Sequence, residues 1–83
     1  MQITLKLFAT LGDFLPAGSR YNQIEVEVPD GVTVAAVILQ HQLPDKLVHL
    51  VLVNGVYINP LERASKVLLA GDVLAIWPPI AGG

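Results

Sequence analysis

The two consecutive prolines near the end of the chain, Pro78 and Pro79, set the strongest limit on what it can fold into. A proline has no backbone N–H to donate and its ring fixes φ, so a proline pair neither continues a helix nor pairs inside a sheet. Regular structure is therefore expected to end at Trp77. The residues that follow are expected to run as a stiff, extended segment held out from the folded body, reaching roughly 18 Å at about 3.1 Å per residue.

The last four residues combine apolar and minimal side chains. Ile80 and Ala81 would prefer an apolar groove to water. Gly82 and Gly83 have no Cβ, so a neighbouring backbone or a nucleophile can approach them closely. The pattern predicts that the Gly83 carboxylate is a reacting group offered to a partner. The alternative is a frayed end with no role.

Composition limits the class of protein. A chain of 83 residues without cysteine is expected to form one domain, residues 1–83, on a hydrophobic core without disulfides. Its 53% hydrophobic content is above the usual range, which indicates apolar surface offered to a partner. A net charge of -2 with only five Lys and Arg residues argues against nucleic acid and anionic membranes. Neither a signal peptide nor a membrane-length apolar run is visible, so a cytoplasmic location is expected.

The first third of the chain alternates apolar and polar residues with a period of two. This pattern predicts strands over residues 2–9 and 22–28, each with one solvated face, joined by a long connection that turns at residues 16–19. The two strands are expected to pair antiparallel. On the first strand the inward set is Ile3, Leu5, Leu7 and Ala9, and the outward set is Gln2, Thr4, Lys6 and Phe8.

A short helix follows the second strand. Residues 29–31, Pro-Asp-Gly, stop that strand, and Thr33 can cap a helix of about ten residues that begins at Val34. Helical spacing predicts an apolar face that packs on the sheet, and Pro44 limits the end of the helix. The expected face consists of Val34, Val37, Ile38 and Leu43.

The second half of the chain returns to strands. Residues 47–53 read as a buried strand, and Asn54-Gly55 is a strong hairpin signal before a short return strand over residues 56–58. A polar crossover leads to the turn at Gly71-Asp72 and to a final strand over residues 73–77. If the final strand lies beside the first, the fold class is α+β, with one helix packed on one face of a mixed sheet.

The outward faces of these strands predict a docking surface. If Leu74 and Ile76 enter the core, then Ala75 and Trp77 point outward with Phe8. In the middle strand, either Leu50 and Leu52 or Val51 and Val53 must also meet the outer face, because both alternate sets are apolar. Such an apolar patch usually marks an interface. The alternative is that loops or self-association cover it.

Five motifs in chain order carry a resemblance to a known family: Leu7-Phe8-Ala9, the run from Val28 to Val34, Val53-Asn54-Gly55, Gly71-Asp72-Val73 and the run from Pro78 to Gly83. The chain resembles the small ubiquitin-like sulfur carriers of the MoaD/ThiS family, and most closely the branch that forms the small subunit of molybdopterin synthase. The resemblance covers essentially the whole chain, and the Pro-Pro-x-x-Gly-Gly end is its most specific part.

The resemblance implies a ubiquitin-like β-grasp fold with one main helix and an extended C-terminal tail at residues 78–83. It further implies that an E1-like, MoeB-like enzyme adenylates the carboxylate of Gly83, next to Gly82, using ATP, and that the product becomes a thiocarboxylate. In the molybdenum branch the tail inserts into a MoaE-like large subunit and gives its sulfur to the pterin precursor. The implied partner-binding residues are Phe8, Tyr57, Trp77, Pro78, Pro79, Ile80 and Ala81.

No catalytic group of its own is expected in the chain. It has neither a glycine-rich phosphate loop with lysine nor a cysteine, so the ATP chemistry would belong to the activating enzyme and no cofactor would be bound intrinsically. His41 and His49 have no cysteine partners for a zinc site, and no metal is expected. Three alternatives to molybdopterin synthesis stay open: a carrier for thiamine thiazole or another thiolated product, a ubiquitin-like modifier of proteins, and a binding module that does not react.

Overall fold

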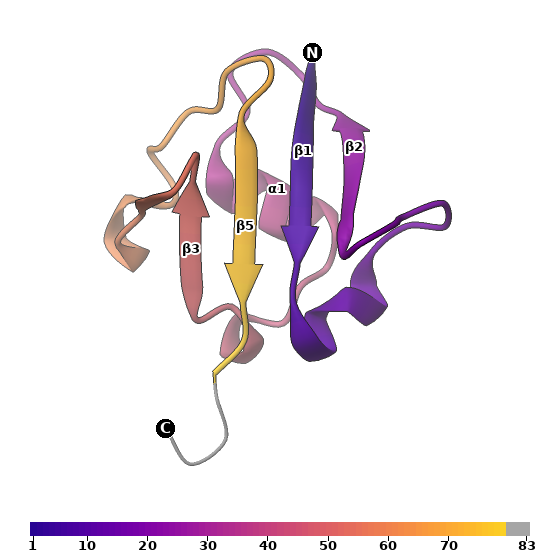
Figure 1. The fold of residues 1–83 in the computed structure, drawn as a ribbon. Helices are drawn as coiled ribbons and strands as arrows, with labels where there is room; N and C mark the ends of the chain where they lie inside the picture. Colours follow the sequence, from indigo (N-terminus) through magenta and orange to yellow (C-terminus); the bar gives the residue numbers. More distant parts are fainter. Residues whose placement is uncertain (80–83) are drawn as a thin grey trace.

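The computed structural model describes residues 1–79, which form a five-stranded sheet with one helix on one face (Figure 1). The sheet order is β2-β1-β5-β3-β4. The elements in chain order are β1 (Gln2–Leu7), the 3-10 helix η1 (Ala9–Phe14), β2 (Gln23–Glu27), α1 (Val34–Gln40), η2 (Asp45–Leu47), β3 (Leu50–Val53), β4 (Val56–Tyr57), η3 (Pro60–Glu62) and β5 (Val73–Trp77).

The sheet is mixed because the final strand lies beside the first. β5 runs parallel to β1, with Leu5 opposite Leu74 and Leu7 opposite Ile76. The pairs β1–β2, β3–β5 and β3–β4 are antiparallel. The α+β arrangement with a mixed sheet, predicted from the order of the elements, is confirmed.

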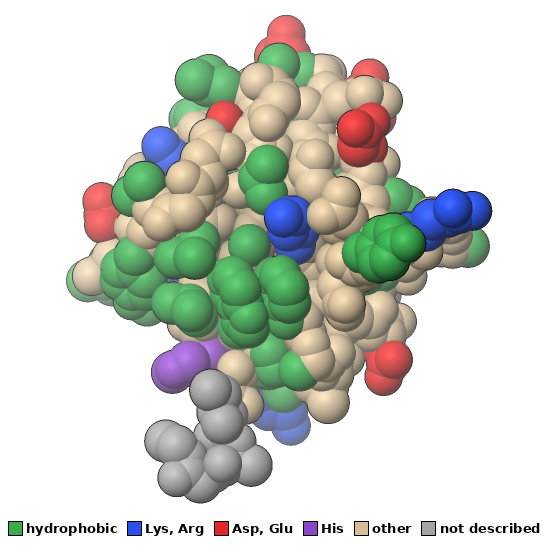
Figure 2. Space-filling view, viewed as in Figure 1, with side chains coloured by type: hydrophobic (Ala, Val, Ile, Leu, Met, Phe, Trp, Pro, Cys, Tyr) green, Lys and Arg blue, Asp and Glu red, His purple; other side chains and the backbone are tan. Residues whose placement is uncertain are grey.

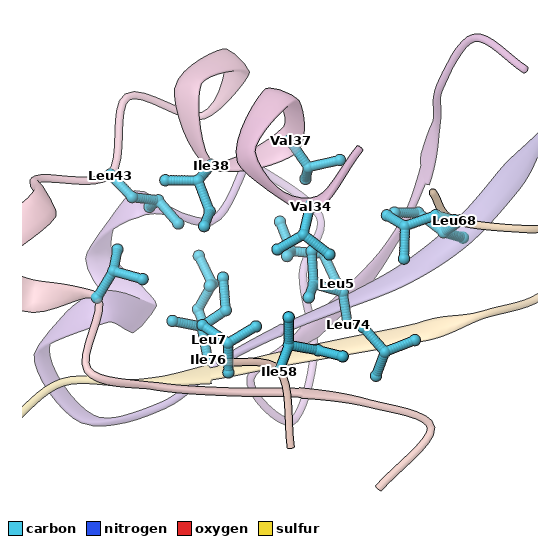
Figure 3. Packing of buried hydrophobic residues seen from close by; sticks show 14 of the residues in the cluster. Leu5, Leu7, Val34, Val37, Ile38, Leu43, Ile58, Leu68, Leu74 and Ile76 are labelled. Atoms are coloured by element: carbon cyan, nitrogen blue, oxygen red, sulfur yellow. The ribbon is translucent and has the colours of Figure 1, made fainter. Parts of the chain in front are cut away.

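The core lies between α1 and the inner face of the sheet. Figure 3 shows the apolar residues of α1 and of the loop after it facing side chains from β1 and β5. The inward set of the first strand is confirmed except for Ala9. The side chains that are fully shielded from water include Leu5, Leu7, Val34, Val37, Leu74 and Ile76.

The cap of α1 is formed as predicted. The Thr33 hydroxyl accepts a hydrogen bond from the Ala36 amide at 3.1 Å, and Thr33 itself is extended. The helix is seven residues long instead of about ten. It ends at Gln40 because His41 departs from helical geometry and Gln42 adopts a left-handed conformation with φ 56.

Four of the five strands are shorter than their patterns predicted: β2 lacks one residue at each end and β4 lacks its last residue, whereas β1 and β3 differ more. β1 ends at Leu7, because Ala9 has φ 52 and starts η1, and this left-handed turn breaks the alternation. Ala9 is therefore exposed, and Leu11 of η1 is buried instead. β3 starts only at Leu50 because residues 45–47 form η2.

The hairpin at Asn54-Gly55 is confirmed. Both residues have positive φ, 51 and 82, as a two-residue turn between twisted antiparallel strands requires. Val53 pairs with Val56 across it, and Leu52 pairs with Tyr57. The turn therefore fixes which face of β4 looks outward.

Candidate docking face

The burial of β3 decides which of its two apolar sets faces outward. Val51 and Val53 are buried against the core, so Leu50 and Leu52 lie on the outer face of the sheet. Both leucines are partly exposed. The sequence left this choice open because all four side chains are apolar.

The register brings these leucines next to aromatic residues. Leu50 pairs with Trp77, and Leu52 pairs with both Ala75 and Tyr57. We call this surface the outer-face patch, and Figure 2 shows apolar side chains gathered on this face over β3 and β5. The outer-face patch consists of Phe8, Leu50, Leu52, Tyr57 and Trp77, together with Ala75, which lies on the same face but is buried.

Phe8 and Trp77 form the end of the patch that adjoins the C-terminal segment. Their rings are stacked, with centroids 4.3 Å apart and planes 2° from parallel. The Phe8 amide donates to the Ile76 carbonyl at 3.1 Å, which places the two residues side by side. Both rings are partly exposed, as the alternation predicted. The pair therefore offers a partly exposed aromatic surface.

Tyr57 is the third aromatic residue that the resemblance placed at an interface. It pairs with Leu52 on the edge strand β4 and is 53% exposed. Its facing could not be settled from the sequence because β4 has only two residues. The hairpin register places Tyr57 on the outer face with Leu52.

The start of the C-terminal segment only partly matches the prediction. β5 ends at Trp77 as expected, but Pro78 is buried, whereas Pro79 is exposed. The His49 amide donates to the Trp77 carbonyl at 3.0 Å, so pairing holds the backbone against the body up to Pro78. Pro78 is therefore part of the body instead of being held out from it. The predictions for Ile80, Ala81, Gly82 and Gly83 concern positions outside the described residues.

The side chains around the outer-face patch are mostly uncharged. Lys6 is a basic residue on the same face, opposite Ala75, and it is partly buried. Among residues 1–79, no group of three or more His, Asp or Glu residues is placed to hold a metal ion. His41 is at the end of α1, where a ring nitrogen lies 3.1 Å from the Val37 carbonyl, and His49 is exposed just before β3.

This arrangement suits docking. A partner can cover an apolar surface on one side of a sheet. Removing that surface from water lowers the free energy of the complex and so favours binding. The surface ends beside Trp77, where the chain leaves the sheet toward Gly83. A partner that covers the outer-face patch would therefore lie next to the end of β5. No helix in the described part of the chain is long and apolar enough to cross a membrane.

A β-grasp domain with an apolar outer sheet face beside its C-terminal segment belongs to the class of ubiquitin-like proteins. The sequence profile of the ThiS family matches residues 5–83. The chain belongs to the ThiS family. No curated protein matches it.

The solved structures that are similar to this chain include a SAMP1 protein and subunits of molybdopterin-converting factors. SAMP1 from Haloferax volcanii is 29% identical, with all of both chains covered and a TM-score of 0.68. A putative molybdopterin converting factor subunit 1 from Pyrococcus furiosus is 22% identical, with 95% of this chain and 98% of that chain covered and a TM-score of 0.70. A complex of subunits 1 and 2 of the molybdopterin-converting factor from Helicobacter pylori contains a chain that is 18% identical, with both chains fully covered and a TM-score of 0.61.

Sequence reasoning left two contributors to the surface unassigned. Leu50 and Leu52 were named as one of two alternative sets for the outer face and were not assigned to it, because Val51 and Val53 are apolar as well. The 3-10 helix η1 was missed as well, since its residues have no helical periodicity. It begins directly after Phe8 and fixes the point at which β1 ends.

Proposed function

We propose that this chain is a sulfur carrier for molybdenum or tungsten cofactor synthesis, and that its reacting group is the Gly83 carboxylate. The observation that carries the proposal is the match to the ThiS family, which runs through residue 83, combined with an apolar docking face that ends at Trp77. The chain itself would be a co-substrate and not a catalyst.

The chemistry would take place on the partner. A carboxylate is a poor electrophile, so an E1-like, MoeB-like enzyme would join the Gly83 carboxylate to the α-phosphate of ATP and release pyrophosphate. A hydrosulfide equivalent would then attack the acyl carbon, forming the C–S bond and breaking the bond to AMP, which leaves. The resulting thiocarboxylate would donate its sulfur to the pterin precursor, held by a MoaE-like large subunit.

The outer-face patch would dock both partners. Aromatic residues are enriched in interface centres, and charged residues are depleted there. The patch has this composition, with Phe8, Trp77 and Tyr57 around two leucines. The fold is shared with subunit 1 of the Helicobacter pylori complex, whose partner in that structure is subunit 2. Pro79, which is exposed, and Ile80 and Ala81 would add contacts along the segment that the partner receives.

A second candidate is a protein modifier joined to lysine side chains through Gly83. The observation that favours it is the 29% identity to the Haloferax volcanii SAMP1 over the whole of both chains, which exceeds the identity to the converting-factor subunits. Both candidates begin with activation of the same carboxylate. They differ in whether sulfur or an amine attacks the activated carbon.

Genetic rescue separates the two candidates. A strain that lacks its own molybdopterin synthase small subunit would receive this chain, the chain without Gly82 and Gly83, or an Ile80→Val variant as a matched control. The proposal predicts that the full chain and Ile80→Val restore molybdoenzyme activity and that the shortened chain does not. Restoration by the shortened chain would contradict it. Lysine-linked conjugates without restored activity would favour the modifier.

A further inference from the structure

Arg63 reaches from the end of η3 to the start of β3. Its Nη1 donates to the Val48 carbonyl at 3.4 Å, and its Nη2 donates to the His49 carbonyl at 3.2 Å. Neither the sequence patterns nor the docking face assigns Arg63 a role. Hydrogen bonds from a charged donor are stronger than neutral ones, and two of them fix the orientation of the guanidinium.

His49, whose carbonyl accepts a hydrogen bond from Arg63, is also hydrogen-bonded to the last residue of β5. The His49 amide donates to the Trp77 carbonyl at 3.0 Å. Trp77 is the last residue of β5, and the buried Pro78 follows it. One peptide segment at His49 therefore connects the Arg63 side chain to the point at which the chain leaves the sheet.

Arg63 is itself anchored on the helix side of the molecule. Its carbonyl accepts a hydrogen bond from the Ala35 amide, in the first turn of α1, at 2.9 Å. Its Nε is buried and has no hydrogen-bond partner within residues 1–79. Burying a donor without a partner opposes folding. We therefore attribute the placement of the guanidinium to the hydrogen bonds of its Nη1 and Nη2 atoms with the Val48 and His49 carbonyls.

We propose that Arg63 is a positioning residue that fixes the end of β5, and with it the direction in which the residues after Pro78 leave the sheet, acting through His49. The consequence for delivery of Gly83 rests on the proposed function. Arg63 is not part of the outer-face patch, so its effect on delivery is separable from docking. If Arg63 stabilised the fold alone, its loss would weaken every part of the sheet equally.

Amide exchange in the free protein tests the structural link. Arg63→Met removes the hydrogen bonds but keeps the length of the side chain, Arg63→Lys keeps the charge, and Arg20→Met is a matched control at an exposed arginine. Arg63→Met is expected to speed exchange of the His49 amide by about fivefold, the effect of losing a typical hydrogen bond. The reference is the Thr4 amide, which donates to Asp72 at the far end of the sheet and should change by less than about twofold.

Trp77 supplies a second readout because it is the single tryptophan of the chain. Its fluorescence emission is expected to shift in Arg63→Met, to shift less in Arg63→Lys, and to stay unchanged in Arg20→Met. Equal acceleration of the His49 and Thr4 amides, or unchanged exchange and emission in Arg63→Met, would overturn the proposal. Neither readout depends on whether Gly83 reacts.

Steady-state kinetics with a cognate activating enzyme test the consequence for delivery. With the carrier as varied substrate, Arg63→Met is expected to lower kcat about fivefold while KM stays within about twofold, because docking is intact and only presentation of the end is impaired. Arg63→Lys should recover part of the loss. An unchanged kcat would overturn this consequence. A wild-type chain that is not activated at all would instead overturn the proposed function, and exchange and fluorescence would still decide the role of Arg63.

Discussion

The rings of Phe8 and Trp77 lie parallel within 2°, with their centroids 4.3 Å apart. Phe8 follows the last residue of β1 and Trp77 is the last residue of β5, so the stack joins the C-terminal ends of these two parallel strands on the outer face. Stacked aromatic pairs contribute about 0.5–1.5 kcal/mol beyond the area they bury. The pair therefore supports the end of β5 and also contributes two of the three aromatic residues of the outer-face patch.

Replacement of Trp77 by glutamate should weaken docking far more than folding. A charge within an interface that excludes water leaves a carboxylate without a partner, so we expect affinity for the activating enzyme or the large subunit to fall by at least about tenfold. The loss of the stack should lower the free energy of unfolding by about 1 kcal/mol. Titration calorimetry and urea unfolding measure the two effects separately.

Tyr21→Glu is the matched control for Trp77→Glu, because Tyr21 is an aromatic residue that is 92% exposed and lies outside the outer-face patch. It should leave both affinity and stability nearly unchanged. Phe8→Asp should behave like Trp77→Glu. If both patch variants lost cooperative unfolding, the two rings would be core residues and the assignment of the docking face would be wrong.

Removal of the helix cap should cost stability without affecting docking. Thr33→Ala deletes the acceptor for the Ala36 amide, which should lower the free energy of unfolding by about 1 kcal/mol. For a domain of this size, that corresponds to a melting temperature about 4–8 °C lower. Thr10→Ala, at an exposed threonine, is the control in thermal unfolding by circular dichroism. Equal melting temperatures for the two variants would contradict the cap assignment.

Asn54 connects the β3–β4 hairpin to the start of β5. Its Oδ1 accepts from the Val73 amide at 2.8 Å, and its Nδ2 donates to Asp72 at 2.9 Å. Asn54→Ala should lower the free energy of unfolding by about 2–3 kcal/mol, since it loses both hydrogen bonds and strains a residue with φ 51.

Asn54→Gly separates the two causes, because glycine accepts the positive φ but has no side chain to hydrogen-bond. We expect it to lose about 1–2 kcal/mol in denaturant unfolding, less than Asn54→Ala. A glycine variant as unstable as the alanine variant would show that backbone strain contributes nothing at this position.

Much of the fold could be predicted because its local signals agree with one another. The Thr33 cap, the Asn54-Gly55 turn and the bounds of β5 all follow from residue chemistry within a few positions. The outward facing of Phe8 and Trp77 follows from period-two alternation alone. These features need no knowledge of distant contacts.

The rest depends on tertiary context. Leu50 and Val51 are both apolar, so only the position of α1 decides which of them is buried. Ala9 was placed on the buried face because alternation cannot reveal a left-handed turn at a residue without glycine or asparagine chemistry. Pro78 was expected outside the folded body. It is buried, because the hydrogen bond from the His49 amide to the Trp77 carbonyl keeps the backbone on the sheet up to this residue.

Intact mass spectrometry tests the central claim most directly. The chain would be incubated with a cognate activating enzyme, ATP and a sulfur source, in parallel with a variant that lacks Gly83. The account predicts a gain of about 16 Da, the exchange of one oxygen for sulfur, in the full chain and no gain in the variant. An unchanged mass of the full chain, under conditions that thiolate a known carrier, would contradict it.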